Sequence, residues 1–145
     1  MVTAVVWITQ SARPLAETLA REFDAEAVHA GSDTAETLRA LFTARRPIIA
    51  LCASGILIRI LAPLLADKHA EPPVVAVAEV GSAAVPLLGG HHGANTFARR
   101  IAEITGGVAP GMHGFAAQLA GEGFGERAGG TCDPDDGGHH PSAPL

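Results

Sequence analysis

Reactive side chains occur at three points of the chain where an apolar run gives way to a turn. Cys52 and Ser54 directly follow one apolar run, and Glu79 ends the next. His91 lies in the Gly-rich segment 89–95, between strand-like and helix-like sequence. Because ligands of open α/β sheets bind beyond the carboxyl ends of parallel strands, we expect the three points to share one edge of a sheet.

The first and third points are strand-to-helix turns that favour an anion as ligand. Glycine lets the backbone approach a ligand closely, and a helix N-terminus offers free N–H groups to negative charge. The first turn holds Gly55, and the other holds Gly89, Gly90 and Gly93. Neither turn matches a P-loop or a dinucleotide fingerprint, so a generic nucleotide-binding domain is the weaker alternative.

Each reactive residue also has a structural explanation. Cys52 lies between Leu51 and Ala53, which favours a small buried side chain over a nucleophile. Ser54 is not in a nucleophile elbow, and a helix cap explains it better. Glu79 is either a solvated strand end or a carboxylate that faces a ligand, and both interpretations stay open.

Two adjacent histidines, His91 and His92, allow two interpretations. Adjacent side chains rarely converge on one metal, and no third ligand follows at zinc spacing, so we expect no metal site. Either both histidines are merely solvated, or one acts as an acid–base group, since histidine titrates near neutral pH.

Strand-like and helix-like segments alternate along residues 1–105. This order predicts an α/β fold with a largely parallel, Rossmann-like sheet, helices on both faces and one antiparallel hairpin at Gly81. Helices are expected after the caps Ser11 and Ser32 or Asp33. Strands are expected at residues 2–9, 25–30, 48–52, 74–80 and 83–88, and further helices at 56–65 and 94–105.

The segment 56–65 is apolar except for Arg59, so we expect a helix that is buried on more than one side. The longer run 47–65 resembles a membrane span, but an arginine costs about 2.5–3.5 kcal/mol near a bilayer centre. We therefore expect strand, turn and helix there. Arg59 should extend to solvent, pair with Glu79 or Asp67, or meet a carboxylate of a ligand.

The chain has 145 residues, is 48% hydrophobic and carries a formal net charge of −5. This fits one domain, expected at residues 1–105, and argues against a basic nucleic-acid-binding surface. Residues 106–145 are rich in Gly and Pro and are expected to form a disordered tail. Two cysteines and the absence of a signal-peptide pattern favour the cytoplasm, with no membrane partner.

Four segments together resemble a known family. They are GILIRILAPLLADKH at 55–69, PPVVAVAE at 72–79, VPLLGGHHGAN at 85–95 and ARRIAE at 98–103. These segments are similar to the amino-terminal module of cobalt-precorrin-5A hydrolase, the CbiG family of cobalamin biosynthesis. The resemblance implies an enzyme that opens a δ-lactone on a cobalt tetrapyrrole with water and releases acetaldehyde. It implies no separate cofactor, because the cobalt arrives with the anionic tetrapyrrole substrate.

The resemblance also suggests site residues, which we state as hypotheses. His91 would act as the acid–base or lactone-polarising group, with Glu79 supporting it. The residues expected to bind substrate are Ser54, Gly55, Arg59, Lys68, Gly89, Gly90, Gly93 and Asn95.

The sequence departs from the family pattern in two respects. Only Gly93 precedes Ala-Asn, where members often have two glycines, and the middle and carboxy-terminal segments of full-length members are missing. The chain is therefore either a module of the hydrolase or a non-catalytic module that binds a tetrapyrrole or a partner. A protein like the carboxy-terminal part of CbiG and a precorrin methyltransferase are the partners this implies, and a homodimer is left open.

Overall fold

The computed structural model describes residues 2–66 and 70–110, except for the side chain of His91. Lys68 and the segment 111–145, which includes most of the expected tail, lie outside the described residues. The main elements are β1 (Ala4–Trp7), α1 (Arg13–Glu22), β2 (Glu26–His29), α2 (Thr34–Thr43), β3 (Ile48–Leu51), α3 (Ser54–Leu61), β4 (Val74–Val77), β5 (Ala84–Leu88) and α4 (Ala94–Thr105). Three short 3-10 turns, η1 (Gln10–Ala12), η2 (Ala62–Leu64) and η3 (Gly90–His92), complete them.

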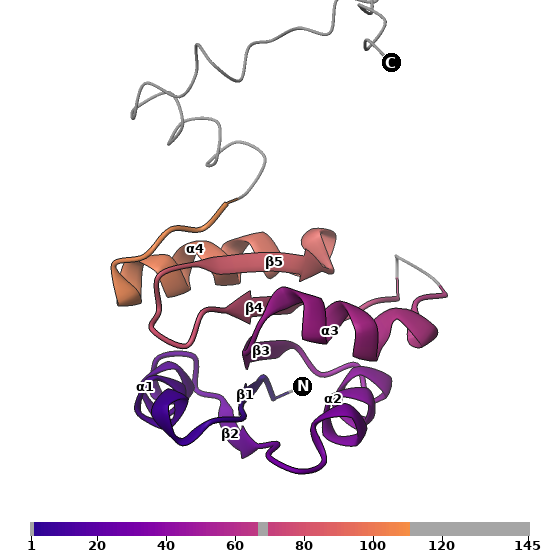
Figure 1. Ribbon diagram of the computed structural model, residues 1–145. Helices are drawn as coiled ribbons and strands as arrows, with labels where there is room; N and C mark the ends of the chain where they lie inside the picture. The colour runs from indigo at the N-terminus through magenta and orange to yellow at the C-terminus, as the bar shows by residue number, and fades with distance from the viewer. Residues whose placement is uncertain (1, 67–69, 111–145) are drawn as a thin grey trace, which may run out of the picture. The chain divides into compact units, whose positions relative to one another are not determined.

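The five strands form one sheet in the order β2-β1-β3-β4-β5. Strands β2, β1, β3 and β4 are parallel, and β5 pairs with β4 in the antiparallel direction. Figure 1 shows β4 and β5 pointing in opposite directions. The α/β fold with one antiparallel hairpin, predicted from the sequence, is confirmed.

The chain reverses its direction of travel across the sheet between β1 and β3. It passes from β1 outward to β2 and then crosses back over β1 to β3. The loops after these two neighbouring strands therefore lead to opposite faces of the sheet, which makes their carboxyl ends the switch point of the fold. In folds of this kind the switch point is the expected ligand site.

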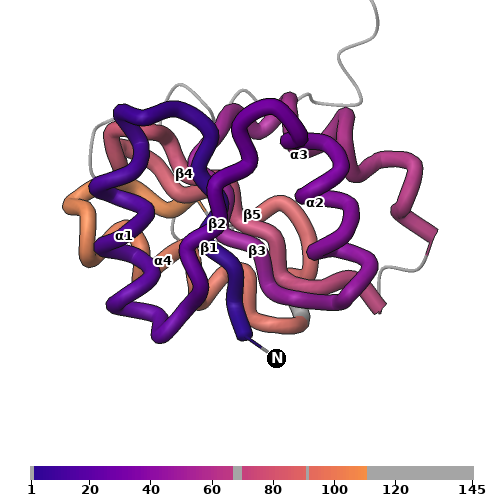
Figure 2. The backbone as a smooth tube through the Cα atoms, turned by 90° about the horizontal axis from the view of Figure 1, so that it is seen from below, coloured from indigo at the N-terminus to yellow at the C-terminus, as the bar shows by residue number. Residues whose placement is uncertain are grey.

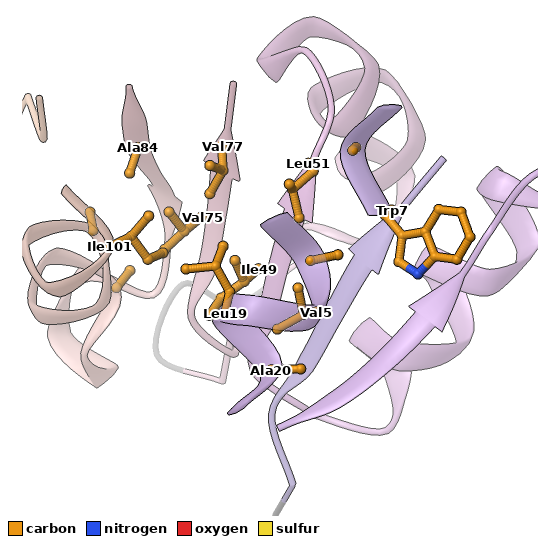
Figure 3. Close-up of a cluster of buried hydrophobic side chains, with 14 residues drawn as sticks. Val5, Trp7, Leu19, Ala20, Ile49, Leu51, Val75, Val77, Ala84 and Ile101 are labelled. Atoms are coloured by element: carbon orange, nitrogen blue, oxygen red, sulfur yellow. The ribbon is translucent and has the colours of Figure 1, made fainter. Parts of the chain in front are cut away.

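Helices cover both faces of the sheet, as expected from right-handed crossovers. Figure 2 shows α1 and α4 on one side of the strands and α2 and α3 on the other. On the first side Leu19 and Ile101 pack with alternate strand residues such as Ile49, as Figure 3 shows. On the other side Leu38 and Leu57 belong to a second buried cluster. Because side chains of a strand alternate between faces, each parallel strand supplies both clusters.

The expected helix caps hold only in part. Ser11 does not cap α1, because it lies inside η1 and α1 begins after Ala12 with Pro14 in its first turn. Asp33 occupies the N-cap position of α2, as expected, but its side chain makes no capping hydrogen bond. Instead the hydroxyl of Thr34 donates to the carbonyl of Gly31 at 3.0 Å. Local hydrogen bonds of this kind compete with capping, and sequence position alone does not decide between them.

Helix α3 is buried on one side only, so the expected burial on several sides is wrong. Leu57 and Leu61 are buried, but Ile56 is 43% and Ile58 is 54% exposed. The physical reason is that α3 lies in an outer layer, with the sheet on one side of it.

Among the helices of residues 2–66 and 70–110, none has the length and apolar character that a membrane span requires.

The described unit continues a few residues past α4. Val108 donates from its N–H to the carbonyl of Ser82 and accepts from the N–H of Ala84. These bonds attach the segment after α4 to the start of β5. The boundary expected at residue 105 thus falls just before a short paired segment.

Candidate functional site

The three reactive points do not share one edge, so this expectation is wrong for the third. Ser54 follows β3 and Glu79 follows β4, which places both at the carboxyl edge of the parallel strands. Gly89 follows β5, whose last residue Leu88 pairs with Val74 at the start of β4. The antiparallel direction of β5 therefore carries the loop with His91 to the amino edge. The five residues of β5 separate the two edges by roughly 17 Å.

At the carboxyl edge, the loops after β1 and β4 meet at Glu79. The hydroxyl of Thr9, just after β1, donates to Oε1 of Glu79 at 2.9 Å. The hydroxyls of Thr9 and Ser11 lie 3.1 Å apart. All three side chains are exposed, so they are accessible to a ligand. Thr9 and Ser11 were not predicted as site residues, although their position directly after a central strand is a signal for a site at the switch point.

Cys52 contributes a buried thiol to this edge. Its side chain is only 7% exposed. Burial is the larger cause and the nearby carboxylate of Glu79 the smaller one, and together they raise the pKa of Cys52 to about 11. The thiolate is the nucleophilic form of cysteine, so a thiol with this pKa is inert near neutral pH. The interpretation of Cys52 as a small buried side chain is confirmed.

The N-terminus of α3 also lies at the carboxyl edge. Ala53 precedes the helix and makes no side-chain capping bond, and no acidic residue occupies the first turn. The expected cap Ser54 is instead the first residue of the helix, so that prediction is wrong. A Cβ atom at Gly55 would meet nothing within 4 Å, so the turn is open to solvent. Such a terminus carries partial positive charge and suits a carboxylate of a ligand.

An aromatic stack flanks the same edge at the ends of β1 and β2. The rings of Trp7 and His29 are stacked, with centroids 3.9 Å apart and an interplanar angle of 17°. Arg13 lies over the indole at 5.6 Å and also pairs with Glu17 at 2.9 Å. Trp7 is the only tryptophan of the chain, so its fluorescence reports on this end of the sheet.

Arg59 does not pair with Glu79, contrary to one of the expected arrangements. It is exposed on the outer side of α3, and in residues 2–66 and 70–110 it forms no ion pair. Glu79 accepts from Thr9 instead. The other expected partner, Asp67, lies outside the described residues.

The amino edge holds the remaining glycines and Asn95. Gly89 has φ +68°, and a Cβ there would lie 2.7 Å from the carbonyl oxygen of Pro72. Gly93, with φ +109°, precedes α4. A depression of about 200 Å³ is lined by Glu71, Pro86, Leu87, Leu88, Gly89, Gly90 and Asn95. Glu71 is the only ionisable group among those lining residues, so the depression itself offers little attraction to an anion. In the described part of the chain, no three side chains are grouped as a metal site would require.

Comparisons with known proteins agree on one family. A family model described as cobalamin synthesis G N-terminal matches residues 36–109, which is half of the chain. A cobalt-precorrin-5A hydrolase of Salmonella typhimurium is 42% identical over 73 residues. A second cobalt-precorrin-5A hydrolase, from Priestia megaterium, is 35% identical over 66 residues.

One solved structure shares the fold. A cobalamin biosynthesis protein G homologue from Sulfolobus solfataricus superposes with a TM-score of 0.63 and 24% identity. The match covers 77% of this chain and 36% of that chain. The two curated relatives are matched over 21% and 18% of their length, so the chain spans about a fifth of each.

Proposed function

Since the chain belongs to the cobalamin synthesis G N-terminal family, we propose that it serves cobalamin biosynthesis as the amino-terminal module of a cobalt-precorrin-5A hydrolase. The observation that carries this proposal is the family match itself, which spans both Ser54 and Glu79 at the carboxyl edge. The identity of 42% to the Salmonella protein supports it over half of the chain.

We place the reaction at the carboxyl edge, around Glu79. In lactone opening, the oxygen of water bonds to the carbonyl carbon and the ring C–O bond breaks. The proton that water loses passes to Oε2 of Glu79 and then to the released alkoxide, which leaves a carboxylic acid and a hydroxyl group. A carboxylate in reach of water performs such general base catalysis. Release of acetaldehyde then breaks a carbon–carbon bond. The hydroxyl group loses its proton as its carbon becomes the aldehyde, and the ring carbon that loses the two-carbon unit takes up one proton in exchange.

The substrate is expected to carry several carboxylates, and we propose that the carboxyl edge binds one of them. The first N–H groups of α3, at Ser54 and Gly55, face solvent without an acidic neighbour in the first turn. Arg59, one and a half turns further along α3, offers a cation. We propose these three residues as substrate-binding groups, and no cofactor beyond the cobalt of the substrate.

Lys68 stays a proposed substrate-binding residue, and it lies outside the described residues. The roles proposed for His91 and the amino-edge residues do not belong to the site at Glu79. Gly89, Gly90, Gly93 and Asn95 cannot contact a small group bound at Glu79, because β5 separates the two edges. We retain His91 as an acid–base candidate only for chemistry at the amino edge, and its pairing with Glu79 is dropped.

A second candidate function is a non-catalytic module that holds the tetrapyrrole for a partner. The N-terminus of α3, without an acidic residue in its first turn, supports it, because this feature suits the binding of a carboxylate and needs no chemistry. The partner would be a protein like the remainder of the hydrolase, or a precorrin methyltransferase. For either function we propose a cytoplasmic location.

An acetaldehyde assay distinguishes the two functions. The chain is incubated with cobalt-precorrin-5A, alone and together with the part of the Salmonella hydrolase that lies beyond the matched region. Acetaldehyde from the chain alone supports the hydrolase. Acetaldehyde only in the mixture supports a module that needs its partner, and none in either, with no binding of the substrate, contradicts both.

A further inference from the structure

The hydrogen bond between Thr9 and Glu79 joins two loops that lie 70 residues apart in the chain. Thr9 follows β1 and Glu79 follows β4, and β3 lies between these strands. The bond therefore crosses the end of β3, at the switch point, rather than joining the loops of two adjacent strands. An exposed carboxylate would otherwise rotate freely, and this contact holds one of its oxygens in place.

The direction of the hydrogen bonds follows from the chemistry of the groups. An ionised carboxylate only accepts, so the single hydroxyl hydrogen of Thr9 is used on Glu79. In the 3.1 Å contact between Thr9 and Ser11, Ser11 must then be the donor. The result is a directed chain from Ser11 to Thr9 to Oε1. Within the described residues nothing donates to Oε2, so this oxygen is left to accept a proton from water.

We propose that Thr9 is a positioning residue for the hydrolysis, which orients Glu79 at the switch point and is itself oriented by Ser11. This inference rests on the proposed function of Glu79. A general base must hold its accepting oxygen within hydrogen-bond reach of the attacking water. Thr9 provides this by occupying Oε1, which leaves Oε2 to accept from water.

The first experiment tests the hydrogen bond without any substrate. The unfolding equilibrium is measured for Thr9→Val, Glu79→Ala and the double variant. We expect the two changes to be coupled by about threefold in the unfolding equilibrium constant, as for a modest hydrogen bond at an exposed site. Additive changes would mean that the bond is not formed in solution, and would overturn the inference.

The second experiment tests positioning through kinetics. The acetaldehyde assay is run in the format that releases acetaldehyde, which is either the chain alone or the mixture. In this assay Thr9→Val should lower kcat about tenfold and leave KM within about twofold. Thr9→Ser keeps the hydroxyl and should restore most of kcat. The matched control is Thr18→Val, which should leave kcat unchanged. The hydroxyl of Thr18 bonds only within α1, where it donates to the carbonyl of Pro14 and accepts from Arg21.

The outcomes separate this inference from the proposed function. If Glu79→Gln lowers kcat strongly and Thr9→Val does not, the role of Thr9 is wrong and the hydrolase site stands. If Glu79→Gln has no effect, the proposed site fails and the inference fails with it. Equal loss of activity in Thr9→Val and Thr9→Ser would also overturn the inference, since the hydroxyl would then not matter.

Discussion

A single methyl group added to a glycine has opposite consequences at two positions of this chain. Gly89 combines φ +68° with a neighbouring carbonyl oxygen 2.7 Å from the Cβ site. Gly55 lies in the first turn of α3 with open space around it. The residue type is the same, and only the surroundings differ.

We expect Gly89→Ala to lower the free energy of unfolding by about 1–3 kcal/mol, through backbone strain and the contact with Pro72. Gly55→Ala should instead raise it by roughly 0.5–1 kcal/mol, because alanine loses less backbone entropy in a helix. Urea unfolding of both variants measures the difference. Equal effects would contradict the described geometry at Gly89.

The thiol of Cys52 gives a pH-dependent prediction. Its pKa is raised in the folded chain, so between about pH 9 and 11 the folded state keeps a proton that the unfolded state has lost. The free energy of unfolding must therefore fall as the pH rises through this window. Cys52→Ala should show a shallower fall between pH 9 and 11 than the wild-type chain, measured by urea unfolding at each pH. An identical slope in both would show that Cys52 does not titrate with a raised pKa.

At the scale of residues, the sequence indicated Glu79 but not its partners. A carboxylate that ends a run of five apolar residues is conspicuous in any sequence. Thr9 and Ser11 carry no such contrast, because hydroxyl residues are common in turns. Their contact with Glu79 depends on the strand order, which brings the loops after β1 and β4 together.

Helix α3 shows how an element can be predicted while its environment is not. Its position after β3 followed from the turn at Ser54, but its all-round apolar pattern suggested deep burial. The structure covers it on one side, and Ile56 and Ile58 remain exposed. A pattern of apolar residues reports on hydrophobicity and does not reveal whether another layer lies above the helix.

Adjacent truncations in α3 test this one-sided burial. Leu57→Ala removes a fully buried side chain and should lower the free energy of unfolding by about 2–5 kcal/mol. Ile58→Ala removes a side chain of equal size that is 54% exposed, and should cost less than about 1 kcal/mol. The ratio of the two effects from denaturant unfolding is the measurement. A large effect at Ile58 would mean that another surface covers this side of α3 in solution.

At the scale of the whole molecule, the strand directions decide which residues can act together. The sequence predicted the hairpin at Gly81, and that hairpin already implied that the strand after it runs backward. The rule that ligands bind at carboxyl ends of strands holds for parallel strands, so it did not apply to the loop 89–95. The family motifs around Glu79 and His91 consequently lie at opposite edges, a separation that similarity of sequence does not reveal.

The proposed function requires that the carboxyl edge binds the anionic corrin. Binding can be followed by quenching of the fluorescence of Trp7, because a corrin absorbs light where tryptophan emits. The probe is a cobalt corrin polycarboxylate, titrated into three forms of the chain at low ionic strength. Ser54→Asp adds a negative charge to the first turn of α3, and Asn95→Asp adds the same charge to the first turn of α4 at the amino edge. Aspartate is well tolerated in a first helical turn, so both variants should fold.

The titration has opposite outcomes for the two edges. We expect Ser54→Asp to weaken binding about tenfold, through repulsion between like charges and loss of the favourable helix terminus. We expect Asn95→Asp to bind as the wild-type chain does. Weaker binding by Asn95→Asp together with unchanged binding by Ser54→Asp would place the corrin at the amino edge and overturn the proposed site.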